Sequence, residues 1–291
     1  MNLRARFSLP QWLLGSLLNL TCGLLISCGG SGDLSQAVAE QHANYRVVDL
    51  SDGSSTYRSS LDDVASNPAY RDQLLVLRHV PESQAALGAT TDEPFIDDDE
   101  QPPHQATIAE HYLGIFELTR AQWQRLTPGN TPWIDLGITD SDVTHPATGM
   151  SLIDAEDVLK QWSTTHGLQL TLPTGNSWES AARCTGGAFG FDPTQPSVSN
   201  TFARTRESLS TDSGTTTGTA PVGQRRANAW GLFDMHGNAA ELTAGRDPDA
   251  FAEVRGGSWY DPIATARATN RVALPPQSGH PLVGLRVVLL P

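Results

Sequence analysis

Short apolar runs separated by turn residues characterise the chain after residue 44. Arg46-Val47-Val48-Asp49-Leu50 is followed by Ser51-Asp52-Gly53-Ser54, so residues 45–58 are predicted to form a strand, a turn and a second strand. The run from Leu74 to Pro81 predicts another strand. Residues 92–103 are acidic and proline-rich, which predicts a solvated loop; a cation-binding loop is the alternative, although the run lacks the alternating spacing of a calcium loop.

Three segments carry helix signals. Thr119 with Gln122 and Ser151 with Asp154 each have the spacing of an N-terminal capping box, and apolar residues at helical spacing follow both. The segment from Thr174 places Trp178 and Ala182 four residues apart, as a helix face requires. Few regular elements among many Gly- and Thr-rich loops predict an α+β domain with little regular secondary structure.

The N-terminus has the pattern of an export signal. Residues 1–27 begin with Arg4 and Arg6 and continue as a leucine-rich apolar stretch. Leu25-Ile26-Ser27-Cys28 then resembles the lipobox of bacterial lipoproteins, in which the cysteine is lipid-modified. A plain signal peptide or a short membrane anchor is the alternative. We therefore expect a lipoprotein signal peptide over 1–27, lipidation at Cys28 and a tether over 28–44.

The residue after Cys28 predicts where such a lipoprotein is sorted. Position 29 is glycine rather than an acidic residue, which by the sorting pattern of Gram-negative bacteria predicts the outer membrane, on its periplasmic or surface-facing side. The expected contact with the membrane is the lipid anchor, because acyl chains and not a basic patch would hold so acidic a chain there.

Composition narrows the function further. The chain has 19 Lys and Arg against 32 Asp and Glu, a net charge of −13, which argues against nucleic-acid binding. Cys184 is the one cysteine beyond the leader, so neither an internal disulfide nor a cysteine-rich zinc site is expected, and we predict a buried apolar role for it. No His-Glu-x-x-His pattern and no Gly-x-Ser-x-Gly elbow occur, which argues against a catalytic zinc and a serine hydrolase.

Five motifs in order resemble the formylglycine-generating enzyme, or sulfatase-modifying factor, family. They are Asp99-Glu100-Gln101-Pro102-Pro103-His104 with Tyr112-Leu113-Gly114-Ile115-Phe116; His145-Pro146-Ala147-Thr148-Gly149-Met150-Ser151; Leu172-Pro173-Thr174 with Trp178-Glu179-Ser180-Ala181-Ala182-Arg183; Asn228-Ala229-Trp230-Gly231-Leu232-Phe233-Asp234-Met235-His236-Gly237-Asn238; and Arg255-Gly256-Gly257-Ser258-Trp259 with Gly284-Leu285-Arg286. The resemblance implies a C-type-lectin-like α+β fold for residues 74–291, preceded by an N-terminal strand segment over 45–73.

One departure from the family decides the expected chemistry. Oxidising members carry a cysteine pair after the Gly-Gly-Ser motif that binds copper(I) and attacks a substrate cysteine. Asp261 and Ala266 occupy those positions in this chain. Neither side chain offers the soft thiolate that copper(I) requires, so no copper and no copper-dependent formylglycine synthesis are expected.

Two further motif positions also differ. Many members carry an acidic residue after Leu-Pro-Thr, where this chain has Gly175. The two tryptophans that follow Gly-Asn in many members are replaced by Ala240 and Leu242. These changes predict that the residues around the pocket usual in the family differ in this chain.

The resemblance also implies two structural calcium sites. One set is carried over to Asp234, Gly237, Ala239 and Glu241, and the other to Asn200, Thr201 and Asp212. Oxygen ligands on a glycine-containing turn suit calcium. The alternative is that Asp234 caps the turn and Glu241 is solvated.

The pocket residues expected from the resemblance lie around the Gly-Gly-Ser motif. They are Ser258, Trp259, Tyr260, Asp261 and Arg267. We expect the pocket between segments 175–183 and 255–271. Arginines 255, 267, 271 and 286 are expected to pair with buried carboxylates and carbonyls.

Three functions follow as hypotheses. The first is a non-catalytic binding or scaffold module at the cell envelope, for a protein, peptide or glycan. The second is an enzyme of protein or siderophore maturation that uses non-copper oxidative or acid–base chemistry, with Asp261 and Glu241 as candidate acid and base. The third is a variable ligand-display protein in which residues 260–283 differ between copies.

Overall fold

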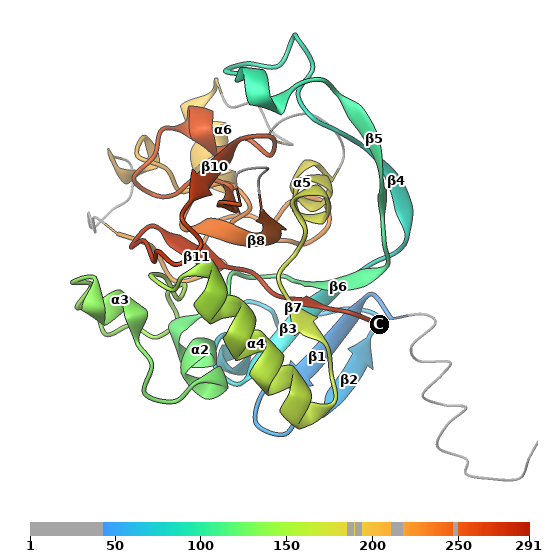
Figure 1. Ribbon diagram of the computed structural model, residues 1–291, viewed down its shortest axis with the longest axis vertical. Coiled ribbons are helices and arrows are strands. Elements are labelled where there is room, and N and C mark those ends of the chain that lie inside the picture. The colour runs from blue at the N-terminus through green and yellow to red at the C-terminus, as the bar shows by residue number, and fades with distance from the viewer. Residues whose placement is uncertain (1–42, 185–188, 190–193, 211–217, 247–249) are drawn as a thin grey trace, which may run out of the picture.

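The computed structural model describes residues 43–184, 189, 194–210, 218–246 and 250–291 (Figure 1). The expected signal peptide, the lipidation site Cys28 and all but the end of the expected tether lie outside the described residues. Within the described part, no helix combines the length and apolar character that crossing a bilayer would need.

A six-stranded antiparallel sheet forms one layer of the molecule. Its strands lie in the order β2-β1-β3-β6-β12-β7. Their bounds are β1 (Tyr45–Asp49), β2 (Ser55–Arg58), β3 (Leu74–Val80), β6 (His111–Gly114), β7 (Leu170–Thr171) and β12 (Val288–Leu289). The predicted strands at 45–58 and 74–81 are confirmed. Because β1 pairs with both β2 and β3, the N-terminal strand segment is part of this sheet rather than a separate unit.

Both faces of this sheet are covered, which explains why its strands are apolar without strict alternation. On β3, Leu75 and Leu77 face one core and Val76 faces the other. The first core receives Trp123 from α2 (Arg120–Leu126) and the inner face of α4 (Leu152–His166), which crosses the sheet in Figure 1. The second core receives Trp178 from α5 (Gly175–Arg183). The sheet therefore joins two cores.

The helix signals in the sequence are confirmed. The side chains of Thr119 and Ser151 each accept a hydrogen bond from the backbone N–H of the N3 residue. In return, the N3 side chain accepts a hydrogen bond from the backbone N–H of the capping residue, which completes a capping box. Thr174 caps α5. Two short helices are α3 (Pro132–Asp135) and α6 (Pro196–Phe202), and the 3₁₀ turns are η1 (Pro68–Arg71), η2 (Asp98–Glu100), η3 (Ser208–Ser210) and η4 (Ile263–Ala266).

A second sheet and a ribbon complete the fold. The second sheet has the order β10-β9-β8-β11, with β8 (Ala240–Arg246), β9 (Ala252–Arg255), β10 (Arg271–Leu274) and β11 (Val283–Leu285). The ribbon of β4 (Ser83–Leu87) and β5 (His104–Ile108) curves past α5 at the edge of the molecule (Figure 1). Antiparallel pairs, one parallel β8–β11 pair and few helices confirm the predicted α+β class.

Candidate functional site

The Gly-Gly-Ser turn is held by its own residues. Gly256 and Gly257 have φ of +87° and +64°, which a side chain would strain. Ser258, fully buried, donates from its backbone N–H (2.9 Å) and its hydroxyl (2.6 Å) to Asp261 Oδ2. The Ser258 hydroxyl and Asp261 Oδ2 thus hold the turn, so Ser258 does not line the cleft described below, and Asp261 is partly buried.

The second position of the family's cysteine pair is closed as well. Ala266 has no exposed surface and packs with Phe189 and Ile263. Its carbonyl accepts from His236 Nδ1 at 2.7 Å, which leaves that imidazole structural. A methyl group and an engaged carboxylate do not fit copper(I), which takes soft sulfur ligands. No redox step can be derived from these two side chains.

Glu241 lies in a buried charge cluster and not in a cleft. We call Glu117, Asp234, Glu241 and Arg286 the Arg286 cluster; all four are at most 5% exposed. Arg286 donates to Glu241 Oε1 at 2.7 Å, and Trp178 Nε1 donates to Oε2 at 2.6 Å. Since both carboxylate oxygens already have donors and the side chain is buried, Glu241 is poorly placed as an acid or base for a substrate.

Calcium does not fit the first predicted ligand set as the structure arranges it. The guanidinium of Arg286 holds the Glu241 carboxylate that the ion would need. Asp234 Oδ2 accepts from the backbone N–H of Gly223 at 2.6 Å. The Ala239 N–H bonds Glu117 at 2.8 Å, and Gly237 is pinned by a bond to the carbonyl of Gly256. Of the expected oxygen ligands, the Glu241 carboxylate and Asp234 Oδ2 are therefore already engaged.

Burial shifts the pKa values of the groups in the Arg286 cluster. It raises the pKa of Glu117 well above its usual value, and Asp234 and Glu241 add to the rise. It raises the pKa of Asp234 to about 6, although Gly223 and Arg286 oppose the rise. Burial would lower the pKa of Arg286, but Glu241 outweighs it and the pKa is raised. The single positive charge of Arg286 thus interacts with three buried carboxyl groups.

The second predicted calcium set is described only in part. Asn200 and Thr201 lie on α6, and Asp212 lies outside the described residues. The carbonyl of Thr201 accepts from the backbone N–H of Arg226 at 2.8 Å. These two residues alone do not make an ion site.

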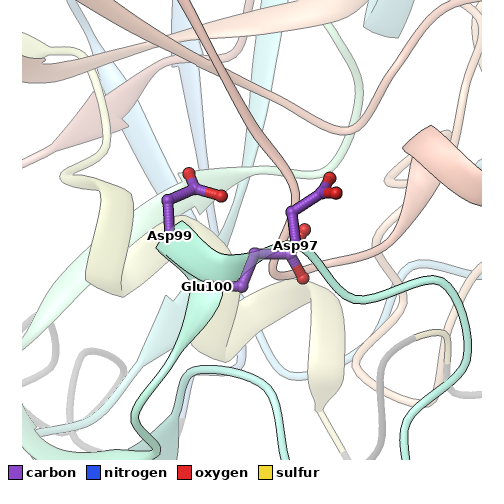
Figure 2. Close-up of side chains that lie close together, drawn as sticks. All are labelled: Asp97, Asp99 and Glu100. Carbon is purple, nitrogen blue, oxygen red and sulfur yellow. The ribbon is translucent and has the colours of Figure 1, made fainter.

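Asp97, Asp99 and Glu100 bring carboxylate oxygens within 4.8 Å of one another at η2, as Figure 2 shows. Two arginines lie against them. Arg267 pairs with Glu100 and lies 3.5 Å from Asp97, and Arg271 lies 3.5 Å from Asp99. The group ties the acidic loop to the segment after the Gly-Gly-Ser turn. Arg267 is 1% exposed and serves this tie, contrary to its predicted place in the pocket.

The expected pocket between segments 175–183 and 255–271 is a packed seam. Arg255 pairs with Glu179 of α5 at 3.2 Å and with Glu253 at 2.8 Å. A Cβ atom at Gly256 would lie 3.0 Å from the ring of Trp178. The predicted pairing with buried carboxylates is confirmed for Arg255, Arg267 and Arg286, whereas Arg271 lies beside the exposed Asp99. Side chains of the two segments pack against each other where the pocket was expected.

An open cleft lies on the other side of the turn. Its volume is about 900 Å³, and we call it the aromatic cleft. It is lined by Arg120, residues within 137–145, residues 218–221, Trp259, Tyr260 and residues 280–282. The rings of Trp259 and Tyr260 are 5.6 Å apart, edge to face, and Tyr260 is 59% exposed. Of the predicted pocket residues, these two line the cleft.

One wall of the cleft carries two carboxylates around a histidine. His145 Nε2 lies 3.4 Å from Asp140 and 3.8 Å from Asp142, and its Nδ1 bonds the Thr219 hydroxyl at 2.9 Å. Burial holds the pKa of His145 below its usual value, and Arg120 acts in the same direction. Asp140 and Asp142 were not among the site residues predicted from the sequence. Their Asp-x-Asp spacing just before the His145-Pro146 motif was the available signal.

Cys184 borders a second cavity. It is partly exposed at the C-terminal end of α5, contrary to the predicted buried role, and lines a cavity of about 600 Å³ with Phe189, Asp234 and His236. Neither Asp261 nor Ala266 lines that cavity.

Solved structures share this fold at low sequence identity. PvdO from Pseudomonas aeruginosa is 22% identical, with a TM-score of 0.65 over 75% of this chain and 95% of its own. Treponema denticola variable protein 1 is 18% identical, with a TM-score of 0.63 over 75% of this chain and 96% of its own. CarF is 19% identical, with a TM-score of 0.53 over 74% and 98%. No curated protein sequence matches the chain.

The family follows from the sequence match. The model of the sulfatase-modifying factor enzyme 1-like domain matches residues 65–290, which span the second sheet, the seam and the cleft. The match includes the motifs that build the Arg286 cluster and the Gly-Gly-Ser turn. The chain belongs to the family of sulfatase-modifying factor enzyme 1-like domains.

Proposed function

We propose that this protein is a ligand-binding or scaffold module of the cell envelope and that its ligand occupies the aromatic cleft. In this proposal the lipid on Cys28 attaches the chain to the outer membrane, and the folded domain acts without copper. The ligand is a protein, a peptide or a glycan.

The contrast within the Gly-Gly-Ser turn carries the proposal. At the two positions that the oxidising relatives give to cysteines, Asp261 is bonded to Ser258 and Ala266 is buried. Between them and the Gly-Gly pair, Trp259 and Tyr260 open into a cleft of about 900 Å³. Ligand sites are concave, partly apolar and supplied with a few polar groups, and this cleft has those properties.

The enzymatic alternative has less support from the geometry. Its candidate base Glu241 is 1% exposed and its candidate acid Asp261 holds the turn. The display alternative uses the same cleft, because Tyr260 and residues 280–282 lie at the two ends of the segment 260–283. It differs from the main proposal in predicting variation between copies, not in the site.

Two measurements on the full chain in detergent test the proposal. The first incubates it with copper(I), oxygen and a sulfatase-type cysteine peptide; we expect no aldehyde by mass spectrometry. The second applies the chain to peptide and glycan arrays. The double variant W259A/Y260A is expected to lose binding, and V272A, which alters another exposed apolar residue outside the cleft, is expected to keep it. Aldehyde formation, or equal binding by W259A/Y260A, would overturn the proposal.

A further inference from the structure

We propose that the ligand of the aromatic cleft is a basic peptide segment, with a Lys or Arg side chain seated between Asp140, Asp142 and the Trp259–Tyr260 pair. This inference rests on the proposed function, because it names the chemistry of the same cleft. It draws on the carboxylates, the charge balance, the rings and the apolar rim.

The two carboxylates are fixed in place before any ligand binds. Arg120 donates to the carbonyls of Asp140 (2.9 Å) and Asp142 (3.1 Å). Asp140 Oδ1 accepts from the N–H of Asp142, and Asp142 Oδ1 accepts from the N–H and hydroxyl of Thr144. The side chains remain 47% and 45% exposed, with Oδ2 of each turned toward His145; Asp140 Oδ2 also lies 3.5 Å from Arg120 Nη1, which leaves Asp142 without a guanidinium partner of its own among the described residues. A preformed pair of acceptors loses little entropy when a ligand arrives.

The charge balance of the wall favours a cation. Arg120 is the one Lys or Arg side chain among the described lining residues, and it is 2% exposed, behind the carboxylates. Because burial keeps the pKa of His145 low, its ring is neutral at pH 7. Two carboxylates against one guanidinium leave the wall negative. The net charge of −13 on the whole chain attracts cations at longer range.

The ring pair suits the same ligand. A cation over the face of an aromatic ring is attracted by the ring quadrupole, most strongly at tryptophan. Trp259 is partly buried and fixed by its backbone bond to Asn238 at 3.0 Å, and Tyr260 projects into solvent. The aliphatic stem of Lys or Arg packs on such surfaces while its charged head reaches a carboxylate.

The rim points to a peptide rather than a free small cation. Of the eight exposed large apolar residues in the described part, Tyr260 lines the cleft and Val143 lies between the lining residues Asp142 and His145. Exposed apolar residues at a cleft are typical of surfaces that bind another chain. A small amine would leave these residues uncovered.

The test uses an array of short random peptides, read with the wild-type chain and two charge variants. D140N/D142N removes both carboxylates of the wall, while the amide oxygens can still accept from the backbone. E82Q/D157N removes the same charge from exposed positions outside the cleft. We expect wild-type binders to be enriched in Lys and Arg. We expect D140N/D142N to bind them about tenfold more weakly and E82Q/D157N to bind them unchanged.

The outcomes separate the two proposals. Binding that depends on Trp259 and Tyr260 but shows no basic preference, a preference for acidic peptides, binding of glycans alone, or insensitivity to D140N/D142N would each overturn this inference and leave the proposed function standing. Absence of any cleft-dependent binding overturns both. Thermal unfolding of D140N/D142N close to wild type verifies that the variant is folded.

Discussion

The Arg286 cluster and the aromatic cleft use the same residue types in opposite ways. In the cluster, carboxylates and a guanidinium are buried, bonded on nearly every atom and sealed under Trp178. In the cleft, Asp140 and Asp142 are fixed by backbone bonds while about half of each side chain meets solvent. The family motifs fall mostly on the cluster and the seam. The comparison indicates that these motifs mainly specify the folded framework, while the ligand recognition that we propose depends on the loops around the cleft.

Removal of the Arg286 side chain is expected to have the largest effect on stability and tests this contrast most directly. R286M leaves Glu241, Asp234 and Glu117 without their cation. Uncompensated buried charge costs about 3–5 kcal/mol, so we expect that loss in the free energy of unfolding, measured by denaturant titration. R125A, which breaks an exposed pair with Asp72, is the control and is expected to cost less than about 1 kcal/mol.

The same denaturant titration is applied to variants of the aromatic cleft. W259A and Y260A are expected to change stability far less than R286M, because Tyr260 is exposed and Trp259 only partly buried. A loss for Y260A as large as that for R286M would erase the distinction between folded framework and recognition surface.

The next effect is a hidden pH dependence. The pKa of Asp234 is raised from 3.8 to about 6, so its stabilising contribution is present below pH 3.8 and is lost as the pH rises through about 6. The pKa of His236 is lowered from 6.5 to about 4, so its contribution is present above pH 6.5 and is lost as the pH falls toward 4. Each amounts to about 3 kcal/mol, and their slopes oppose one another.

Single variants should separate the two slopes. In the wild type, the contribution of Asp234 to the free energy of unfolding decreases as the pH rises from 4 to 6. D234N lacks this decrease, so its stability relative to wild type is expected to increase over that range. The contribution of His236 increases over the same pH range. H236N lacks this increase, so its stability relative to wild type is expected to decrease as the pH rises. Denaturant titrations at several pH values measure both. Parallel pH profiles for the two variants would contradict the assignment.

The smallest effect sharpens the role of the seam. A side chain at Gly175 would meet Glu253 Oε1 and lie 3.2 Å from Arg255. Glu253 thus supplies beside Arg255 the carboxylate that many relatives carry after Leu-Pro-Thr. We expect G175D to cost about 1–3 kcal/mol by overpacking and like-charge contact.

The double variant G175D/E253A is the test of this exchange. If one carboxylate replaces the other, the double variant is expected to be more stable than the sum of the two single losses predicts, by denaturant titration. Additive losses would show that the two positions do not share one role.

Local signals explain what the sequence could predict. The capping residues Thr119 and Ser151 act within a few positions of themselves, so α2 and α4 could be read directly. The family resemblance added the arginine pairing, because Arg255 and Arg286 stand in motifs. These predictions needed no knowledge of how distant segments meet.

The site could be predicted only in part, because distant segments decide it. Trp259 and Tyr260 were found, but Ser258 and Arg267 were assigned to a pocket although Asp261 and Glu100 hold them inside. The wall with Asp140 reaches the Gly-Gly-Ser turn only through the folding of the whole chain. The sequence showed only that Gly175 lacks the acidic side chain of many relatives, and the structure places the distant Glu253 against it.

The position of β12 bears on the order of assembly. This strand lies between β6 and β7, so it joins two parts of the first sheet that otherwise do not pair. Synthesis proceeds from the N-terminus, and every other strand of that sheet emerges earlier. Until β12 is made, the edges of β6 and β7 are open to proteases and to other chains. A chain interrupted before residue 288 therefore leaves the first sheet in two parts with unpaired edges.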